Sequence, residues 1–96
     1  MRPSTALHNH RDAIRAIALS HRVASVRVFG SVLHGEDTDG SDLDLLVEPT
    51  ADTTLMDIAR IEQALQCLLQ VPVDVLTPAA LPEHFRQQVL SEALPV

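Results

Sequence analysis

The segment SDLDLLV, residues 41–47, determines how the rest of the chain is interpreted. In a β-strand, alternate side chains point to opposite faces, so Asp42 and Asp44 share one face while three apolar residues share the other. Neighbouring residues on one face lie roughly 7 Å apart, so two carboxylates can share a divalent cation and repel each other without one. The segment therefore predicts a strand with one apolar face and one acidic, cation-binding face.

A third acid stands in an apolar run further along the chain. Residues 71–76 read VPVDVL, in which Asp74 lies between two valines and Pro72 near the start suits an edge strand. If this strand packs beside residues 41–47, three carboxylates meet at one place, and oxygen ligands in that number suit Mg²⁺ or Mn²⁺. The alternative is a solvated sheet face whose acids bind nothing.

The segment upstream of the acidic strand offers a place for an anion. GSVLHG, residues 30–35, directly follows the alternating β-branched run of residues 24–29. Gly30 allows the backbone to approach a phosphate, and a short helix beginning near Ser31 offers free N–H groups and a hydroxyl. The alternative is an ordinary strand-to-helix turn. The short spacing to Asp42 favours a site in which one element holds a triphosphate and the next holds the metal that bridges it.

The remaining periodicity predicts an α/β fold of the α+β type, with a small mixed β-sheet of about three strands flanked by helices. We expect a single domain, residues 1–96, because a chain of this length supports one core. Helices are expected at residues 9–20, 55–69 and 82–93. In the second helix, the residues expected to face the core are Leu55, Ile58, Ala59, Leu65, Leu68 and Leu69.

Several conspicuous polar residues are given ordinary structural roles. His8 and His10 lie near the N-terminus without a further ligand nearby, which indicates a solvated, frayed end. Asp37 and Asp39 are expected to keep a loop soluble. His34 lies inside the glycine segment, where a protonated imidazole could contact phosphate but the neutral form is expected to dominate near pH 7.

The composition excludes several classes of protein. The 96 residues carry seven basic and thirteen acidic side chains, a formal net charge of -6, which argues against direct nucleic-acid binding. One cysteine gives neither a disulfide framework nor the cysteine pair of a structural zinc site, and no apolar run approaches the ~20 residues of a membrane span. We therefore expect a cytoplasmic protein that does not bind membranes. No tyrosine is present, which excludes a tyrosine nucleophile in this chain.

The glycine segment, the acidic strand and the later isolated aspartate together resemble the minimal nucleotidyltransferases of the DNA polymerase β superfamily. The resemblance covers nearly the whole chain and implies the polymerase β-like fold. The nucleotide-binding residues that it implies are Gly30, Ser31, Gly35 and Ser41. The metal ligands and catalytic residues that it implies are Asp42, Asp44 and Asp74. Where relatives often carry an arginine between the two glycines, this chain has Val32, Leu33 and His34.

The resemblance also implies a partner and a reaction. Many such proteins are the antitoxin half of a toxin–antitoxin pair and transfer AMP from ATP to a tyrosine hydroxyl of a HEPN-domain toxin, with two Mg²⁺ ions or with Mn²⁺. On this interpretation the chain is a protein adenylyltransferase in a hetero-oligomer, and residues 82–96 are the candidate docking surface. One alternative is a binding-only antitoxin with vestigial activity. Another is a small-molecule nucleotidyltransferase, for which little chain remains to hold the acceptor.

Overall fold

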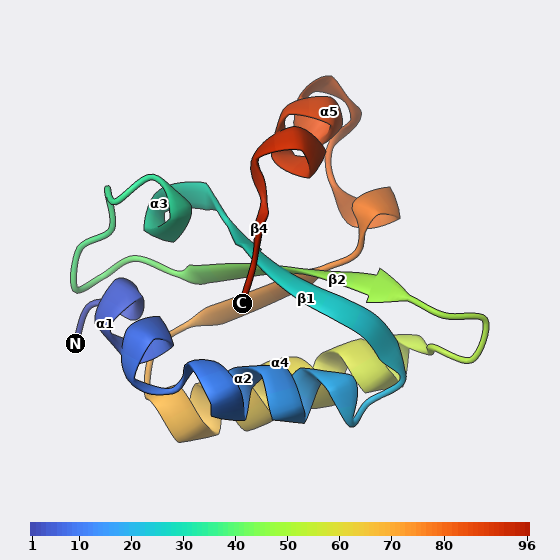
Figure 1. The fold of residues 1–96 in the computed structure, drawn as a ribbon, viewed down its shortest axis with the longest axis horizontal. Coiled ribbons are helices and arrows are strands. Elements are labelled where there is room, and N and C mark those ends of the chain that lie inside the picture. The colour runs from blue at the N-terminus through green and yellow to red at the C-terminus, as the bar shows by residue number, and fades with distance from the viewer.

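One mixed β-sheet organises the computed structural model, which describes residues 1–96 (Figure 1). The strands are β1 (Val23–Phe29), β2 (Leu43–Pro49), β3 (Val73–Leu76) and β4 (Leu94–Pro95). Their order across the sheet is β3–β2–β1–β4, with β1 antiparallel to β2 and β4, and β2 parallel to β3. The predicted mixed sheet and the edge position of the third strand are confirmed, and β4 is a short fourth strand that the sequence did not predict.

Helices lie on both sides of this sheet. They are α1 (Pro3–Asn9), α2 (Arg11–Leu19), α3 (Gly30–Leu33), α4 (Leu55–Leu69) and α5 (Glu83–Glu92), with a 3₁₀ turn, η1 (Pro78–Ala80). Figure 1 shows α2 and α4 together on one side and α5 on the other. α4 provides the crossover that the parallel pair β2 and β3 requires. None of these helices is both long and apolar enough to cross a bilayer.

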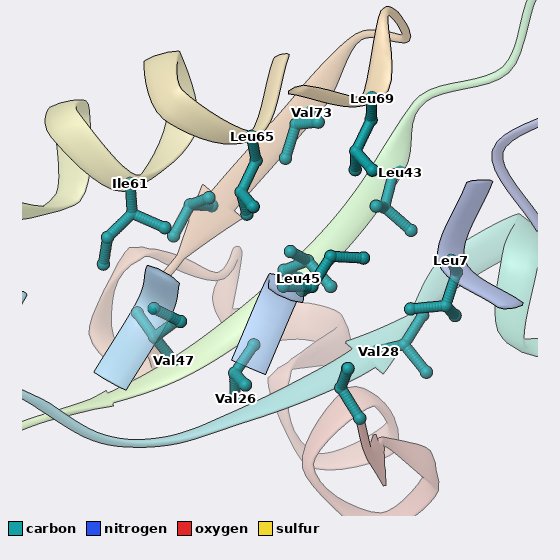
Figure 2. Packing of buried hydrophobic residues seen from close by; sticks show 14 of the residues in the cluster. Leu7, Val26, Val28, Leu43, Leu45, Val47, Ile61, Leu65, Leu69 and Val73 are labelled. Atoms are coloured by element: carbon teal, nitrogen blue, oxygen red, sulfur yellow. The ribbon is translucent and has the colours of Figure 1, made fainter. Parts of the chain in front are cut away.

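The main core lies between the sheet and the pair α2 and α4. Strand alternation sends one apolar set toward these helices, and Figure 2 shows these side chains converging with those of α4. The strand residues of this set are Val26, Val28, Leu43, Leu45, Val47, Val73 and Val75. Ile61 and Leu65 of α4 and Ile14 of α2 are fully buried against them. The predicted apolar face of residues 41–47 is confirmed.

The opposite face of the sheet is only partly covered. There α5 packs over a smaller cluster, formed by Phe29, Leu46, Leu81 and Ala93. Val89 and Leu90 of α5 contact this cluster and are half-buried. Asp42 and Asp74 remain exposed on the uncovered part of this face. The sheet therefore has one closed apolar face and one face that is open at its acidic end.

The boundaries of α4 agree with the sequence prediction, but part of its predicted inward face is wrong. Thr54 and Asp57 form a reciprocal capping box, in which the Thr54 hydroxyl accepts from the Asp57 N–H and the Asp57 carboxylate accepts from the Thr54 N–H. Leu55 is 90% exposed, because it is the first helical residue and lies off the buried stripe. Ala59 and Leu68 are also exposed.

The N-terminus is ordered into two helices where one helix from residue 9 and a frayed end were predicted. Pro3 begins α1, where its missing N–H removes no helical hydrogen bond. Ala6 and Leu7 are buried in the main core and hold α1 in place. His10 ends α1 by donating its backbone N–H to the Ala6 carbonyl at 3.0 Å. The expectation that His8 and His10 lie in a frayed segment is therefore wrong.

Asp37 is buried, so its predicted role in keeping a loop soluble is also wrong. Its Oδ2 accepts a hydrogen bond from the Ser4 backbone N–H at 2.8 Å, and its Oδ1 accepts one from Arg2 Nη2 at 3.1 Å. The Ser4 backbone bond, followed by the Arg2 charge, lowers the pKa of Asp37 below its ordinary value. The loop between the glycine segment and the acidic strand is thereby fixed to the first turn of α1.

The apolar end of the chain belongs largely to the core. Val96 is 4% exposed, and its backbone N–H donates to the Val26 carbonyl at 3.2 Å. The Arg15 guanidinium donates to the Val96 backbone carbonyl, with its Nε at 3.0 Å. Of the two apolar side chains Leu94 and Val96, only Leu94 remains exposed and available to a partner.

Candidate functional site

Three acids lie at the open end of the second sheet face. Parallel pairing places Asp44 of β2 opposite Asp74 of β3. Asp42 immediately precedes Leu43, the first residue of β2, and its carboxyl is near enough to that of Asp74 to help raise the pKa of Asp74. The structure thus brings together the three aspartates singled out in the sequence, because two adjacent strands present them on the same face.

The electrostatics of these acids indicate a place for positive charge. Burial, followed by the charges of Asp74 and Asp42, raises the pKa of Asp44 to about 6. Burial, followed by Asp42 and Glu62, also raises the pKa of Asp74. No arginine is among the groups that affect either carboxyl. The ionised acids therefore repel one another without a protein countercharge, and a divalent cation is what this set of oxygen donors fits.

The acids do not form a ready-made cage. No three His, Cys, Asp or Glu side chains are gathered tightly enough in the structure to hold an ion. Like charges on neighbouring strands favour separated side chains, and Asp42 and Asp74 are exposed enough to rotate. The backbone places the donors together, and the side chains would have to turn inward around a cation.

Gly30 lies against the Asp44 carboxylate, which leaves no room for a side chain at position 30. It begins α3 with φ +75°, and a Cβ at this position would lie 2.3 Å from Oδ2 of Asp44. No side chain fits at that distance, so glycine is required both by the backbone angle and by the carboxylate. Ser31 follows and is half-buried. The predicted neighbourhood of the glycine–serine pair and the acidic strand is present in the structure.

Gly35 and Ser41 occupy positions with clear local roles. Gly35 lies in an exposed turn after α3 with φ +70° and has no heavy atom within 4 Å of an added Cβ. The Ser41 hydroxyl accepts a hydrogen bond from the Thr38 backbone N–H at 2.8 Å and so shapes the loop before Asp42. Neither residue lines the cleft described next.

A cleft of about 400 Å³ separates Gly30 and Asp44 from α5. Its α5 wall includes Phe85, Gln88 and Glu92. Sequence reasoning did not select these residues for a site, because nothing in a weakly patterned C-terminal helix shows which strand end it will face. Phe85 and Val89 are half-buried and line the cleft.

A hydrogen bond joins the glycine segment to α5 beside the cleft. Nε2 of His34 lies 3.0 Å from Oε2 of Glu92. Gln88 Nε2 donates to the other oxygen of Glu92 at 3.2 Å. His34, which stands where an arginine was expected from the family pattern, is therefore engaged by a carboxylate in the structure.

An acidic strand pair beside a glycine–serine turn is an arrangement that could hold a nucleotide and a metal ion. The family comparison identifies the class: the chain belongs to the nucleotidyltransferase domain family, whose model matches residues 7–96. A solved structure described provisionally as a minimal nucleotidyltransferase is 44% identical, with a TM-score of 0.86 over 100% of this chain and 97% of that chain. The family resemblance of the sequence and the expected fold are confirmed.

Curated relatives carry more specific names. Protein adenylyltransferase MntA of Thermococcus cleftensis is 32% identical over 91 residues, covering 86% of this chain and 92% of its own. A protein of Methanocaldococcus jannaschii, provisionally named a protein adenylyltransferase, is 35% identical over 80 residues, covering 83% and 86%. A toxin–antitoxin crystal structure with AMP-PNP shares the fold at 20% identity, with a TM-score of 0.73 over 91% of this chain and 71% of that chain.

Proposed function

We propose that this nucleotidyltransferase is an antitoxin that transfers AMP from ATP to a tyrosine hydroxyl of a HEPN-domain toxin. The observation that carries the proposal is the placement of Asp44 opposite Asp74 on an open sheet face, with Gly30 against the Asp44 carboxylate. The names of the relatives as protein adenylyltransferases, and of a similar structure as a toxin–antitoxin complex, support the acceptor and the partner.

The acids fit two Mg²⁺ ions, or Mn²⁺, which when bound would neutralise charge on the transferring phosphate. Asp42, Asp44 and Asp74 would hold them, since they lie at the same end of one sheet face and have no protein countercharge among them. Gly30 and Ser31 would bind the phosphates, because the glycine backbone lies against Asp44 and no Cβ blocks the approach of a phosphate.

The chemical step is an in-line displacement at the α-phosphorus of ATP. The acceptor oxygen forms a bond to that phosphorus, and the bond to the bridging oxygen of the departing pyrophosphate breaks. The proton of the acceptor hydroxyl passes to the Asp74 carboxylate, which is exposed beside the other two acids. Asp74 lies on the edge strand β3, where an acceptor can approach from outside the sheet. Catalysis on this account depends mainly on positioning.

A second protein must supply the acceptor. The chain has no tyrosine, and its net charge of -6 disfavours RNA as an acceptor. Holding a hydroxyl in line requires a fixed geometry, and a docked partner would provide it over the open acidic face. Leu94 and the exposed side of α5 are the remaining candidates for docking, since Val96 is buried.

A binding-only antitoxin is the second candidate. It is favoured by the His34–Glu92 contact, because the imidazole that could contact a phosphate when protonated is engaged by a carboxylate. On that account the chain would block its toxin by contact alone.

Labelled ATP distinguishes these functions. The chain is incubated with Mg²⁺, its HEPN-type partner and ATP carrying the label on either the α- or the γ-phosphate. AMP transfer predicts that only the α-label enters the partner. Entry of the γ-label would indicate phosphoryl transfer, and a stable complex with neither label would favour the binding-only antitoxin.

A further inference from the structure

Two side chains of α4 bind the outer edge of β3 on either side of Asp74. The Val75 backbone N–H donates to Oε2 of Glu62 at 3.0 Å. The Val73 backbone N–H donates to Oε1 of Gln66 at 3.2 Å. Because β3 is the edge strand, with β2 on one side and no strand on the other, these outward N–H groups have no neighbouring strand to bond. The helix therefore supplies the hydrogen bonds that a further strand would supply.

The two bonds form together because the spacing of the helix matches that of the strand. The two helix residues are four positions apart, about 6 Å along the axis, and the two strand residues are two positions apart, about 6.6 Å along the chain. Figure 2 shows α4 lying beside β3 at the main core. The strand is thus held at two points, one before and one after Asp74.

The position of the Asp74 carboxylate depends on the backbone of β3. The Asp74 side chain is exposed, so packing does not fix it. β3 is four residues long and pairs with a single strand, and Pro72, immediately before it, has no N–H with which to bond. A short strand with one neighbour opens more easily than a central strand unless its outer side is also held. The bonds from α4 hold that outer side.

We propose that Glu62 and Gln66 are positioning residues, which hold β3 so that the Asp74 carboxylate can reach the acceptor hydroxyl. The inference rests on the proposed nucleotidyl transfer and adds to it two residues outside the acidic site. Neither side chain contacts the substrate on this account, since both act through the backbone of β3. Because the phosphates are assigned to Gly30 and Ser31, loss of either bond should lower the rate of transfer and leave ATP binding unchanged.

The hydrogen bond and the charge of Glu62 can be separated, since Glu62 also places a negative charge near Asp74. Glu62→Gln removes the charge but keeps a side-chain oxygen that can accept from the Val75 N–H, whereas Glu62→Ala removes both. The positioning role predicts that glutamine preserves AMP transfer and that alanine does not. An equal loss in the two variants would assign the effect to charge and overturn the proposal.

Steady-state AMP transfer to the HEPN-type partner under Mg-ATP measures the effect, at a temperature well below the melting point of every variant. We expect Glu62→Ala and Gln66→Ala each to lower kcat about tenfold, and the double variant to lower it about 100-fold, the loss that a displacement of about 1 Å causes. KM for ATP should stay within about twofold of wild type, and Glu62→Gln should keep kcat within about threefold.

Two variants of α4 are matched controls. Gln63→Ala replaces an exposed glutamine next to Glu62 and should change neither kcat nor stability. Thr54→Ala removes the N-cap hydrogen bond of α4, so it should lower the melting temperature about as much as Glu62→Ala without changing kcat. An equal fall in kcat in Thr54→Ala and Glu62→Ala would show that stability alone is responsible, and would overturn the positioning role.

Amide hydrogen exchange of the metal-free chain tests the bond without reference to activity. The Val75 amide should lose protection in Glu62→Ala and keep it in Glu62→Gln. Faster exchange at Val75 in Glu62→Ala together with a wild-type kcat would overturn the positioning role and leave nucleotidyl transfer standing. Absence of AMP transfer by the wild type would overturn the proposed function and the positioning role together.

Discussion

Replacement of Gly30 by alanine is expected to have two effects that can be measured separately: a loss of stability of the fold and a displacement of the Asp44 carboxylate. Gly30 has φ +75°, and alanine in the left-handed region costs about 1–2 kcal/mol. For a domain of this size, that cost lowers the melting temperature by about 4–16 °C. The added Cβ would also lie 2.3 Å from Oδ2 of Asp44, so the carboxylate must move by about 1 Å to reach ordinary contact distance.

A displacement of about 1 Å in a catalytic group can reduce a rate by about 100-fold. We therefore expect Gly30→Ala to remain folded below its lowered melting temperature but to lose about 100-fold in AMP transfer to the partner. Thermal denaturation followed by circular dichroism measures the first effect. Transfer of α-labelled AMP under Mg-ATP measures the second.

Two other glycines provide controls. Gly35→Ala has nearly the same backbone angle, φ +70°, but nothing within 4 Å of its added Cβ, so it should lose similar stability without moving Asp44. Gly40→Ala has neither a positive φ nor a close neighbour and should leave stability nearly unchanged. Transfer by Gly30→Ala within a few-fold of that by Gly40→Ala would refute the reasoning that the Asp44 carboxylate must stay where Gly30 allows it.

Three further predictions concern charge. Asp44→Asn should stabilise the metal-free protein by about 1 kcal/mol after solvent screening, because the pKa of Asp44 is raised to about 6 and its ionisation therefore opposes folding. In thermal denaturation, this gain in stability should be absent below pH 3.8, grow toward pH 6 and be complete above pH 6. ATP binding measured by calorimetry should require Mg²⁺ or Mn²⁺ and not be supported by Zn²⁺, and equal affinity in excess EDTA would mean that the acids are not metal ligands. Asp37→Asn should destabilise the protein at neutral pH, because the hydrogen bonds from Ser4 and Arg2 that lower the pKa of Asp37 favour its ionised form. This stabilisation is present above pH 3.8 and is lost as the pH falls through the lowered pKa. Chemical denaturation should therefore show the free energies of unfolding of wild type and Asp37→Asn converging in acid.

The parts of the fold that the sequence predicted are those set by local pattern. Alternation in residues 41–47 predicted the strand and its two faces, and the helical periodicity of residues 55–69 predicted the bounds of α4. Asp42, Asp44 and Asp74 were predicted to meet on the condition that residues 71–76 pack beside residues 41–47, and the register shows that these strands are neighbours.

The errors arise where distant segments decide the outcome. Asp37 is polar and lies among turn-forming residues, and only its contacts with Arg2 and Ser4, more than thirty residues away, bury it. Leu55 is apolar but precedes the stripe of α4 that reaches the sheet. The cleft residues of α5 were missed for the same reason, because their neighbours Gly30 and Asp44 come from a different part of the chain.

The intact mass of the HEPN-type partner tests the central claim most directly. The partner is incubated with Mg-ATP and either the wild-type chain or the Asp44→Asn variant, and both proteins are then weighed by mass spectrometry. The account predicts that wild type adds AMP to the partner and that Asp44→Asn binds the partner but adds nothing. AMP transfer by Asp44→Asn at the wild-type rate, or an unmodified partner in a stable complex with the wild type, would contradict it.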